Sequence, residues 1–132
     1  MAADSVTKSL LCLKAAIERK AQNPVLLEVK GMASFTDYFL LCSGKSDRQV
    51  QAIAHGIEET LKNKGIRPLG QEGVREGKWV LMDYGDVVVH IFLEPIRSFY
   101  DLEGLWIEAP RINLQKGVSV GKENIGSEKR DG

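Results

Sequence analysis

The chain has 132 residues, 43% of them hydrophobic, which is enough for one domain with a single core and leaves no room for a second. Its 18 lysine and arginine residues balance its 18 aspartate and glutamate residues, so charge alone gives no reason to expect binding to nucleic acid. The chain shows neither a signal or transit peptide at its start nor an apolar run of roughly 18 residues, which predicts a bacterial cytoplasmic protein.

Apolar residues recur at steps of three and four near the start of the chain, which predicts an amphipathic first helix. Its predicted buried face consists of Val6, Leu10, Leu13 and Ile17. Asn23-Pro24 is expected to end this helix. Two short β-favouring runs follow, at residues 25–30 and 38–43, and we expect both to be strands.

A second helix is predicted to begin at Ser46, because Ser46 and Gln49 have the spacing of a capping box. Its apolar face is expected to carry Val50, Ile53, Ala54, Ile57 and Leu61. Gly65 is suited to the left-handed conformation that commonly follows the last turn of a helix.

Residues 78–93 are typical of a β-hairpin, because two β-rich runs flank Gly85-Asp86, a pair suited to a type II′ turn. Such a turn fixes the register of the two strands. The predicted partners are Tyr84 with Val87, Asp83 with Val88, Met82 with Val89, Leu81 with His90, Val80 with Ile91, and Trp79 with Phe92. The face that carries Val80, Met82, Val89 and Ile91 is expected to point into the core.

The remaining segments complete the predicted domain. Residues 95–106 have enough apolar positions for one or two short helices that close the fold. Residues 113–132 hold few aliphatic side chains among glycines and charges, which predicts a disordered polar tail after a domain at residues 1–112.

Three long strings carry a resemblance to a known family: SFTDYFLLCSGKSDRQVQAIA from Ser34, KWVLMDYGDVVVHIF from Lys78 and FYDLEGLW from Phe99. In this order and spacing the chain resembles the Iojap or RsfS ribosomal silencing factors from about Leu10 to Arg111. Strings of this length are far more specific than a short motif.

The resemblance implies an α/β (α+β) fold, a small mixed β-sheet flanked by helices and related to the nucleotidyltransferase architecture. It also implies a function without catalysis. The protein would bind the large ribosomal subunit through its fourteenth ribosomal protein and prevent the small subunit from joining, which damps translation when nutrients are scarce. A homodimer is expected when the protein is free.

The hairpin face opposite the predicted core is the candidate partner surface. It mixes aromatic, acidic and imidazole side chains, and tryptophan is enriched where partners bind tightly. The predicted contact residues are Trp79, Leu81, Asp83 and His90, with Glu76, Lys78 and Asp86 beside them. Simpler interpretations remain open: Trp79 covers the sheet under a helix, His90 is a partly covered sheet residue, and Asp86 serves the turn.

Two enzymatic interpretations are disfavoured, so no catalytic residue or cofactor is expected. Ser43-Gly44 before a helix resembles the phosphate-binding turn of nucleotidyltransferases, but no Asp-x-Asp pair follows on a strand to hold magnesium. Cys42 with His55 or His90 would form a nucleophile and base, yet a thiol in an apolar strand is expected to be inert.

Three further possibilities rank lower. Two histidines and two cysteines without ligand spacing predict no metal site. Basic residues at Lys62, Lys64, Arg67, Arg75 and Lys78 alternate with glutamates and lack aromatic neighbours, which favours a solvated surface over an RNA site. A dimeric scaffold with a partner other than the ribosome remains an alternative, and no membrane partner is expected.

Overall fold

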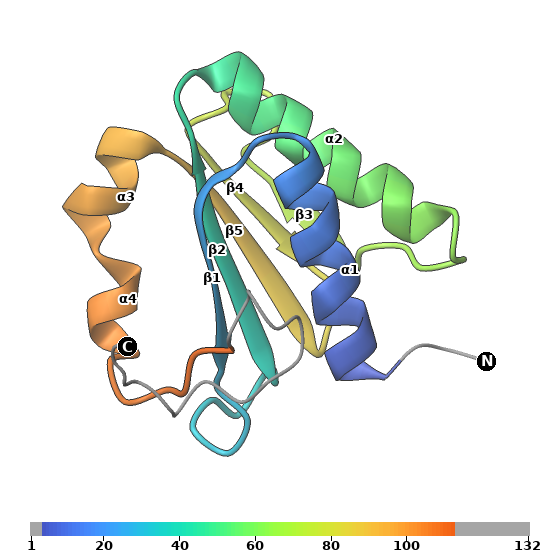
Figure 1. The fold of residues 1–132 in the computed structure, drawn as a ribbon, viewed down its shortest axis with the longest axis vertical. Helices are drawn as coiled ribbons and strands as arrows, with labels where there is room; N and C mark the ends of the chain where they lie inside the picture. The colour runs from blue at the N-terminus through green and yellow to red at the C-terminus, as the bar shows by residue number, and fades with distance from the viewer. Residues whose placement is uncertain (1–3, 113–132) are drawn as a thin grey trace.

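The computed structural model describes residues 4–112, and these form one mixed sheet with helices on both faces (Figure 1). The strands are β1 (Gln22–Glu28), β2 (Tyr38–Gly44), β3 (Gly70–Glu72), β4 (Trp79–Asp83) and β5 (Val87–Leu93). The helices are α1 (Ser5–Glu18), α2 (Asp47–Lys62), α3 (Glu94–Tyr100) and α4 (Leu102–Leu105). The strand order is β1-β2-β5-β4-β3, with β2 and β5 parallel and the other neighbours antiparallel. The predicted mixed α/β fold is confirmed.

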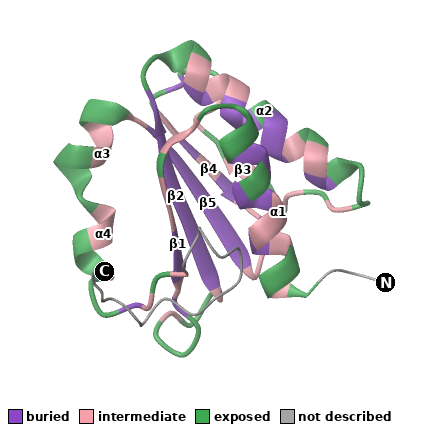
Figure 2. Ribbon diagram, viewed as in Figure 1, coloured by how far each residue is buried: buried purple, intermediate pink, exposed green. Residues whose placement is uncertain are grey.

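Each face of the sheet has its own layer of helices. Helices α1 and α2 cover the first face, and α3 and α4 lie over the second (Figure 1). The larger apolar cluster fills the space under α1 and α2, and a smaller one around Phe39, Leu41 and Phe92 lies under α3 and α4. Figure 2 shows that β2 and β5 are buried along most of their length, whereas the outer sides of α3 and α4 are exposed.

The prediction that Asn23-Pro24 ends the first helix is wrong. The helix ends at Glu18, and Lys20 adopts a left-handed conformation with φ of 66°. The amide of Ala21 donates to the carbonyl of Ala16, so the chain turns back by hydrogen bonds characteristic of a helix C-terminus. A lysine in the left-handed conformation gives no sequence signal, because glycine normally marks this position.

Pro24 instead lies within β1, which begins three residues earlier than the predicted strand. Strand β1 is at the edge of the sheet, and its pairing with β2 shifts register between Gln22 and Val25. Proline is tolerated at such an edge or bulge because no ladder hydrogen bond is lost. On the outer edge, the backbone amide of Glu28 donates to the carbonyl of Pro110, and the backbone amide of Ile112 donates to the carbonyl of Leu26.

The predicted buried face of α1 is correct only in part. Leu13 is buried, but Val6 and Ile17 are 40% and 50% exposed. The buried face consists of Ser9, Cys12, Leu13, Ala15 and Ala16. Small side chains let α1 approach α2 and the sheet closely, so the helix is rotated away from its bulkiest residues.

The predictions for α2 and for the hairpin are confirmed. The Ser46 hydroxyl accepts from the amide of Gln49, and Gly65 has φ of 79° after the last turn. All five predicted apolar positions of α2 are buried. The β4–β5 register is the predicted one, Gly85 has φ of 87°, and the expected core face is fully buried.

The sequence did not predict β3, a three-residue edge strand without an apolar side chain. It pairs with β4 through Gly70–Asp83 and its neighbours, so it exists because β4 offers a free edge. The two short closing helices are confirmed as α3 and α4. The predicted tail at 113–132 lies outside the described residues.

Candidate partner-binding surface

The second face of β4 is the part of the sheet that α3 and α4 leave partly open. Helix α3 packs mainly on β2 and β5. Trp79, Leu81 and Asp83 of β4 are therefore only half-buried, and Tyr100 of α3 lies beside Trp79 with 52% of its surface exposed. These four residues are called the Trp79 surface below.

Aromatic rings link this surface to the core beneath it. The Trp79 ring centroid lies 4.9 Å from that of buried Phe92 and 4.9 Å from that of Tyr100. Tyr100 in turn meets Phe99 at 5.0 Å, and Phe99 is 79% exposed. A row of aromatic rings thus runs from the interior to solvent. The sequence prediction missed Tyr100 and Phe99 as surface candidates, although both belong to the FYDLEGLW string.

His90 lies under the surface, with only 6% exposed, so it offers a partner almost no area. The indole N–H of Trp79 donates to Nδ1 of His90 over 3.1 Å. Burial lowers the pKa of His90 to about 4, which keeps the ring neutral at neutral pH. Trp79 therefore does cover part of the sheet, as the simpler interpretation held, while remaining half-exposed.

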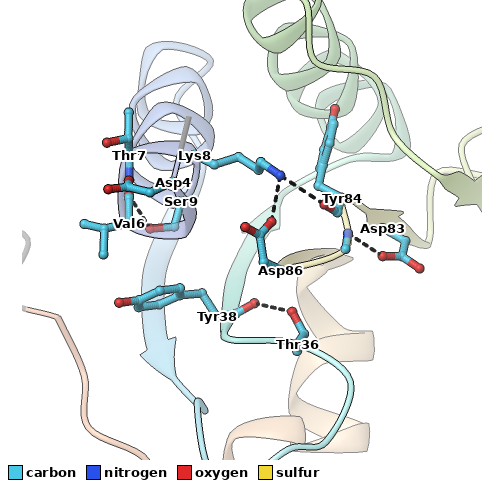
Figure 3. Close-up of polar contacts among 11 residues, drawn as sticks. Asp4, Val6, Thr7, Lys8, Ser9, Thr36, Tyr38, Asp83, Tyr84 and Asp86 are labelled. Atoms are coloured by element: carbon cyan, nitrogen blue, oxygen red, sulfur yellow. Dashed lines mark hydrogen bonds and ion pairs between the residues drawn. The ribbon is translucent and has the colours of Figure 1, made fainter. Parts of the chain in front are cut away.

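Asp83 and Asp86 point in different directions (Figure 3). The Asp83 carboxylate accepts from the amide of Gly85 at 2.8 Å, within the hairpin turn. The Asp86 carboxylate accepts from the Lys8 ammonium at 2.7 Å, and the same ammonium donates to the carbonyl of Tyr84 at 3.3 Å. Asp86 is therefore engaged with α1, on the side away from the Trp79 surface.

Glu76 and Lys78 are exposed on the loop between β3 and β4. The side-chain amide of Gln51 in α2 donates to the carbonyls of Val74 and Arg75 at 3.0 and 2.9 Å, which holds this loop. Gly73 has φ of 83°, and a Cβ there would overlap the carbonyl oxygen of Trp79. The loop is thus fixed directly against the first residue of β4.

Arg97 fixes α3, and with it Tyr100. Its guanidinium is largely buried and donates to a Glu103 carboxylate oxygen at 2.7 Å and to the Ser43 hydroxyl at 2.9 Å. It also reaches the carbonyl of Gln22 at 3.4 Å. One side chain thus ties α3 to α4, to the end of β2 and to the start of β1.

The groups considered for catalysis are not brought together. Cys42 faces α1 and α2 in the larger cluster, whereas His90 lies on the opposite face of the sheet. Burial raises the pKa of the Cys42 thiol to about 12, which disfavours the thiolate. The Ser43 hydroxyl is buried and accepts from Arg97, so it is already engaged within the fold.

Within residues 4–112, no three histidine, cysteine, aspartate or glutamate side chains gather as they would around a metal ion. None of the helices in this same range is long and apolar enough to cross a membrane.

Comparison with known proteins agrees with the resemblance. The sequence pattern of the family described as "Ribosomal silencing factor during starvation" matches residues 2–131. The chain belongs to the RsfS family of ribosomal silencing factors. Among relatives, the "Ribosomal silencing factor RsfS" of Bacillus subtilis is 44% identical over 114 residues, which are 85% of this chain and 97% of that protein.

Solved structures and more distant relatives extend the comparison. The crystal structure of protein CV0518 from Chromobacterium violaceum is 36% identical, with a TM-score of 0.77 over 79% of this chain and 87% of that one. "Protein Iojap, chloroplastic" of Arabidopsis thaliana is 33% identical over 85% of this chain and 47% of its own length. "Mitochondrial assembly of ribosomal large subunit protein 1" of Mus musculus is 30% identical over 67% of this chain and 40% of its own length.

Proposed function

We propose that this protein binds the large ribosomal subunit through its fourteenth ribosomal protein and sterically blocks association with the small subunit, which represses translation under nutrient limitation. The proposed site of action is the bacterial cytoplasm. The proposed mechanism is occupancy of a surface that the small subunit needs, without catalytic turnover. Membership of the RsfS family supports this proposal, as does the name of the mouse relative, which refers to the large ribosomal subunit.

The observation that carries the proposal is the Trp79–Tyr100 pair. Two large aromatic side chains lie 4.9 Å apart, partly exposed, on an ordered frame of sheet and helix. Rigid aromatic groups of this kind supply much of the binding energy at protein interfaces. Asp83 at the end of β4 and Glu76 in the loop before β4 add negative charge, which complements the cationic side chains typical of ribosomal proteins.

The test is co-sedimentation with separated ribosomal subunits, followed by a subunit-joining assay at fixed salt. The parent protein should migrate with the large subunit and reduce the yield of joined ribosomes. The double variant Trp79→Ala, Asp83→Arg should lose binding by about 30-fold or more. A matched control makes the same two kinds of change, a large apolar residue to alanine and an acidic residue to arginine, on the exposed side of α1, as Ile17→Ala, Glu18→Arg, and should bind like the parent.

Two results would reject the proposal. One is a parent protein that binds neither subunit. The other is saturable binding of ATP with magnesium in isothermal titration, which would favour the nucleotidyltransferase-like alternative. Equal binding by the Trp79/Asp83 variant and the parent would reject the assigned surface but not the function.

The homodimer is a separate part of the proposal. Phe99, Leu105 and Ile107 are 79%, 75% and 71% exposed on and after α3, which is a large apolar area for a free monomer. We expect a second copy to cover this area in the absence of ribosomes. Analytical ultracentrifugation of the parent and of Phe99→Glu should show a dimer for the first and a monomer for the second. A monomeric parent would overturn this part.

A further inference from the structure

We propose that His90 is a positioning residue, whose buried Nδ1 fixes the indole of Trp79 in the orientation that the surface presents to its partner. The inference rests on the proposed function for its role in binding. Its geometric part concerns the free protein and can be tested there. The sequence predicts His90 as a contact residue, whereas in the structure His90 is buried beneath Trp79, the proposed contact residue.

The hairpin register brings the two side chains together. Trp79 pairs with Phe92 and Leu81 pairs with His90, so Trp79 and His90 are diagonal neighbours on the second face of the sheet. Diagonal neighbours are within reach of each other when their side chains are large. The two rings approach with centroids 6.1 Å apart, and the indole nitrogen lies 3.1 Å from Nδ1.

The chemistry of the pair defines the protonation of His90. An indole N–H can only donate, so Nδ1 must present its lone pair and the proton of the neutral ring resides on Nε2. Burial keeps the ring neutral near pH 7, with the pKa lowered to about 4. A doubly protonated ring would have no acceptor to offer, and the hydrogen bond would be lost.

His90 can hold Trp79 because His90 is itself held. Phe39 meets the imidazole edge-on, with a centroid distance of 5.4 Å and an interplanar angle of 88°. Phe92 lies nearly parallel to it, at 6.0 Å and 12°. A ring confined in this way presents its acceptor in one direction.

The hydrogen bond to His90 fixes the orientation of the Trp79 indole, which the other contacts of Trp79 do not. Phe92 and Tyr100 contact the indole through ring surfaces, and such contacts tolerate a flipped indole. A hydrogen bond to Nδ1 does not, because it requires the indole nitrogen on the side of His90. Without this hydrogen bond, the Trp79 side chain must be ordered when the partner binds. The conformational entropy lost in that step weakens the affinity by about 3- to 10-fold.

Two variants separate the acceptor from the ring. His90→Phe keeps an aromatic ring and removes the acceptor. His90→Asn removes the ring and places an amide oxygen close to the position of Nδ1. Both are first compared with the parent by thermal unfolding. The indole N–H signals are then recorded by ¹H–¹⁵N NMR in the free protein. The chain has two tryptophans, and Trp106→Phe assigns the signal of Trp79.

The expected result is an upfield shift and faster solvent exchange of the Trp79 indole proton in His90→Phe, with at least partial recovery in His90→Asn. Binding to purified large subunits should weaken about 3- to 10-fold in His90→Phe and recover in His90→Asn. If His90 had a merely structural role, the binding of the two variants would instead follow their thermal stability. It would not follow the presence of a hydrogen-bond acceptor at position 90.

Each contrary outcome has one meaning. An unchanged indole signal in folded His90→Phe overturns the positioning role. A changed signal with parental binding shows that Trp79 needs no such constraint and overturns its link to binding. A parent that binds no large subunit overturns the proposed function and the binding role of His90 with it, while the indole signal still decides whether His90 orients Trp79.

Discussion

The Lys8 ammonium lies 2.7 Å from an Asp86 carboxylate oxygen, although the two residues are 78 positions apart in the sequence. The pair joins α1 to the turn between β4 and β5. It is partly shielded, because the two side chains are 15% and 33% exposed. The same ammonium donates to the carbonyl of Tyr84, so one cation holds both ends of the hairpin turn.

Lys8→Met should therefore lower the free energy of unfolding by about 1 kcal/mol, because a partly shielded charged hydrogen bond is lost while the apolar stem is kept. Urea unfolding measures this change. A double-mutant cycle with Asp86→Asn isolates the pair, and strictly additive effects would show that it contributes no coupling.

Arg97→Met should destabilise the protein by about 2 to 3 kcal/mol and weaken binding to large subunits. The substitution leaves Glu103 without its nearest cation and releases α3, which carries Tyr100. The matched control is Arg111→Met, because Arg111 approaches Glu103 only to 3.7 Å and is 50% exposed. Urea unfolding of both variants checks the prediction, and equal losses would contradict it.

Protonation of His90 should destabilise the protein in acid. The folded pKa is lowered from 6.5 to about 4, so the unfolded chain binds more protons below pH 6.5. The contribution of neutral His90 is complete above pH 6.5 and is lost as the pH falls to 4, by about 3 kcal/mol in total. Urea unfolding of the parent between pH 6.5 and pH 4 should show the free energy of unfolding falling with pH. In His90→Phe, the part of this fall that His90 causes should be absent.

The control for this pH profile is His55→Asn, because His55 is exposed on α2 and the chain has two histidines. This variant keeps His90 and should therefore keep the part of the pH dependence of stability that His90 causes. If the free energy of unfolding of His90→Phe depended on pH as that of the parent does, carboxylates alone would cause the loss of stability in acid.

Gly73→Ala should cost roughly 2 to 4 kcal/mol, since a left-handed conformation and an overlap with the Trp79 carbonyl are both unfavourable for alanine. The natural comparison is Gly70→Ala in β3, where a Cβ meets nothing within 4 Å and φ is not positive. That variant should remain within about 0.5 kcal/mol of the parent. Thermal unfolding of the pair decides, and similar midpoints would refute the account of Gly73.

Local patterns predicted the elements that are determined by local chemistry. The Gly85-Asp86 turn fixes the whole β4–β5 register, and Ser46 with Gln49 fixes the start of α2. The first helix was harder, because its end depends on Lys20 in a conformation that lysine rarely adopts. Its buried face includes small residues, which are buried because they allow close packing and not because they are strongly hydrophobic.

The candidate surface was predictable on β4 and not on α3. Alternation along the hairpin separates the Trp79 side from the Val80 side, which is how the sequence leads to Trp79, Leu81 and Asp83. That Tyr100 joins them depends on Arg97 reaching Ser43, a contact between distant segments. The burial of His90 similarly depends on Phe39 from another strand.

The two edges of the sheet bear on how a partner can approach. On one side, Pro24 interrupts β1 and residues 110–112 occupy part of its outer edge; on the other, β3 offers only three residues within the described chain. Neither edge is a good template for an added strand. Under the proposed function, the aromatic side chains can thus be displayed to a ribosome while the sheet edges disfavour strand-by-strand polymerisation of the protein.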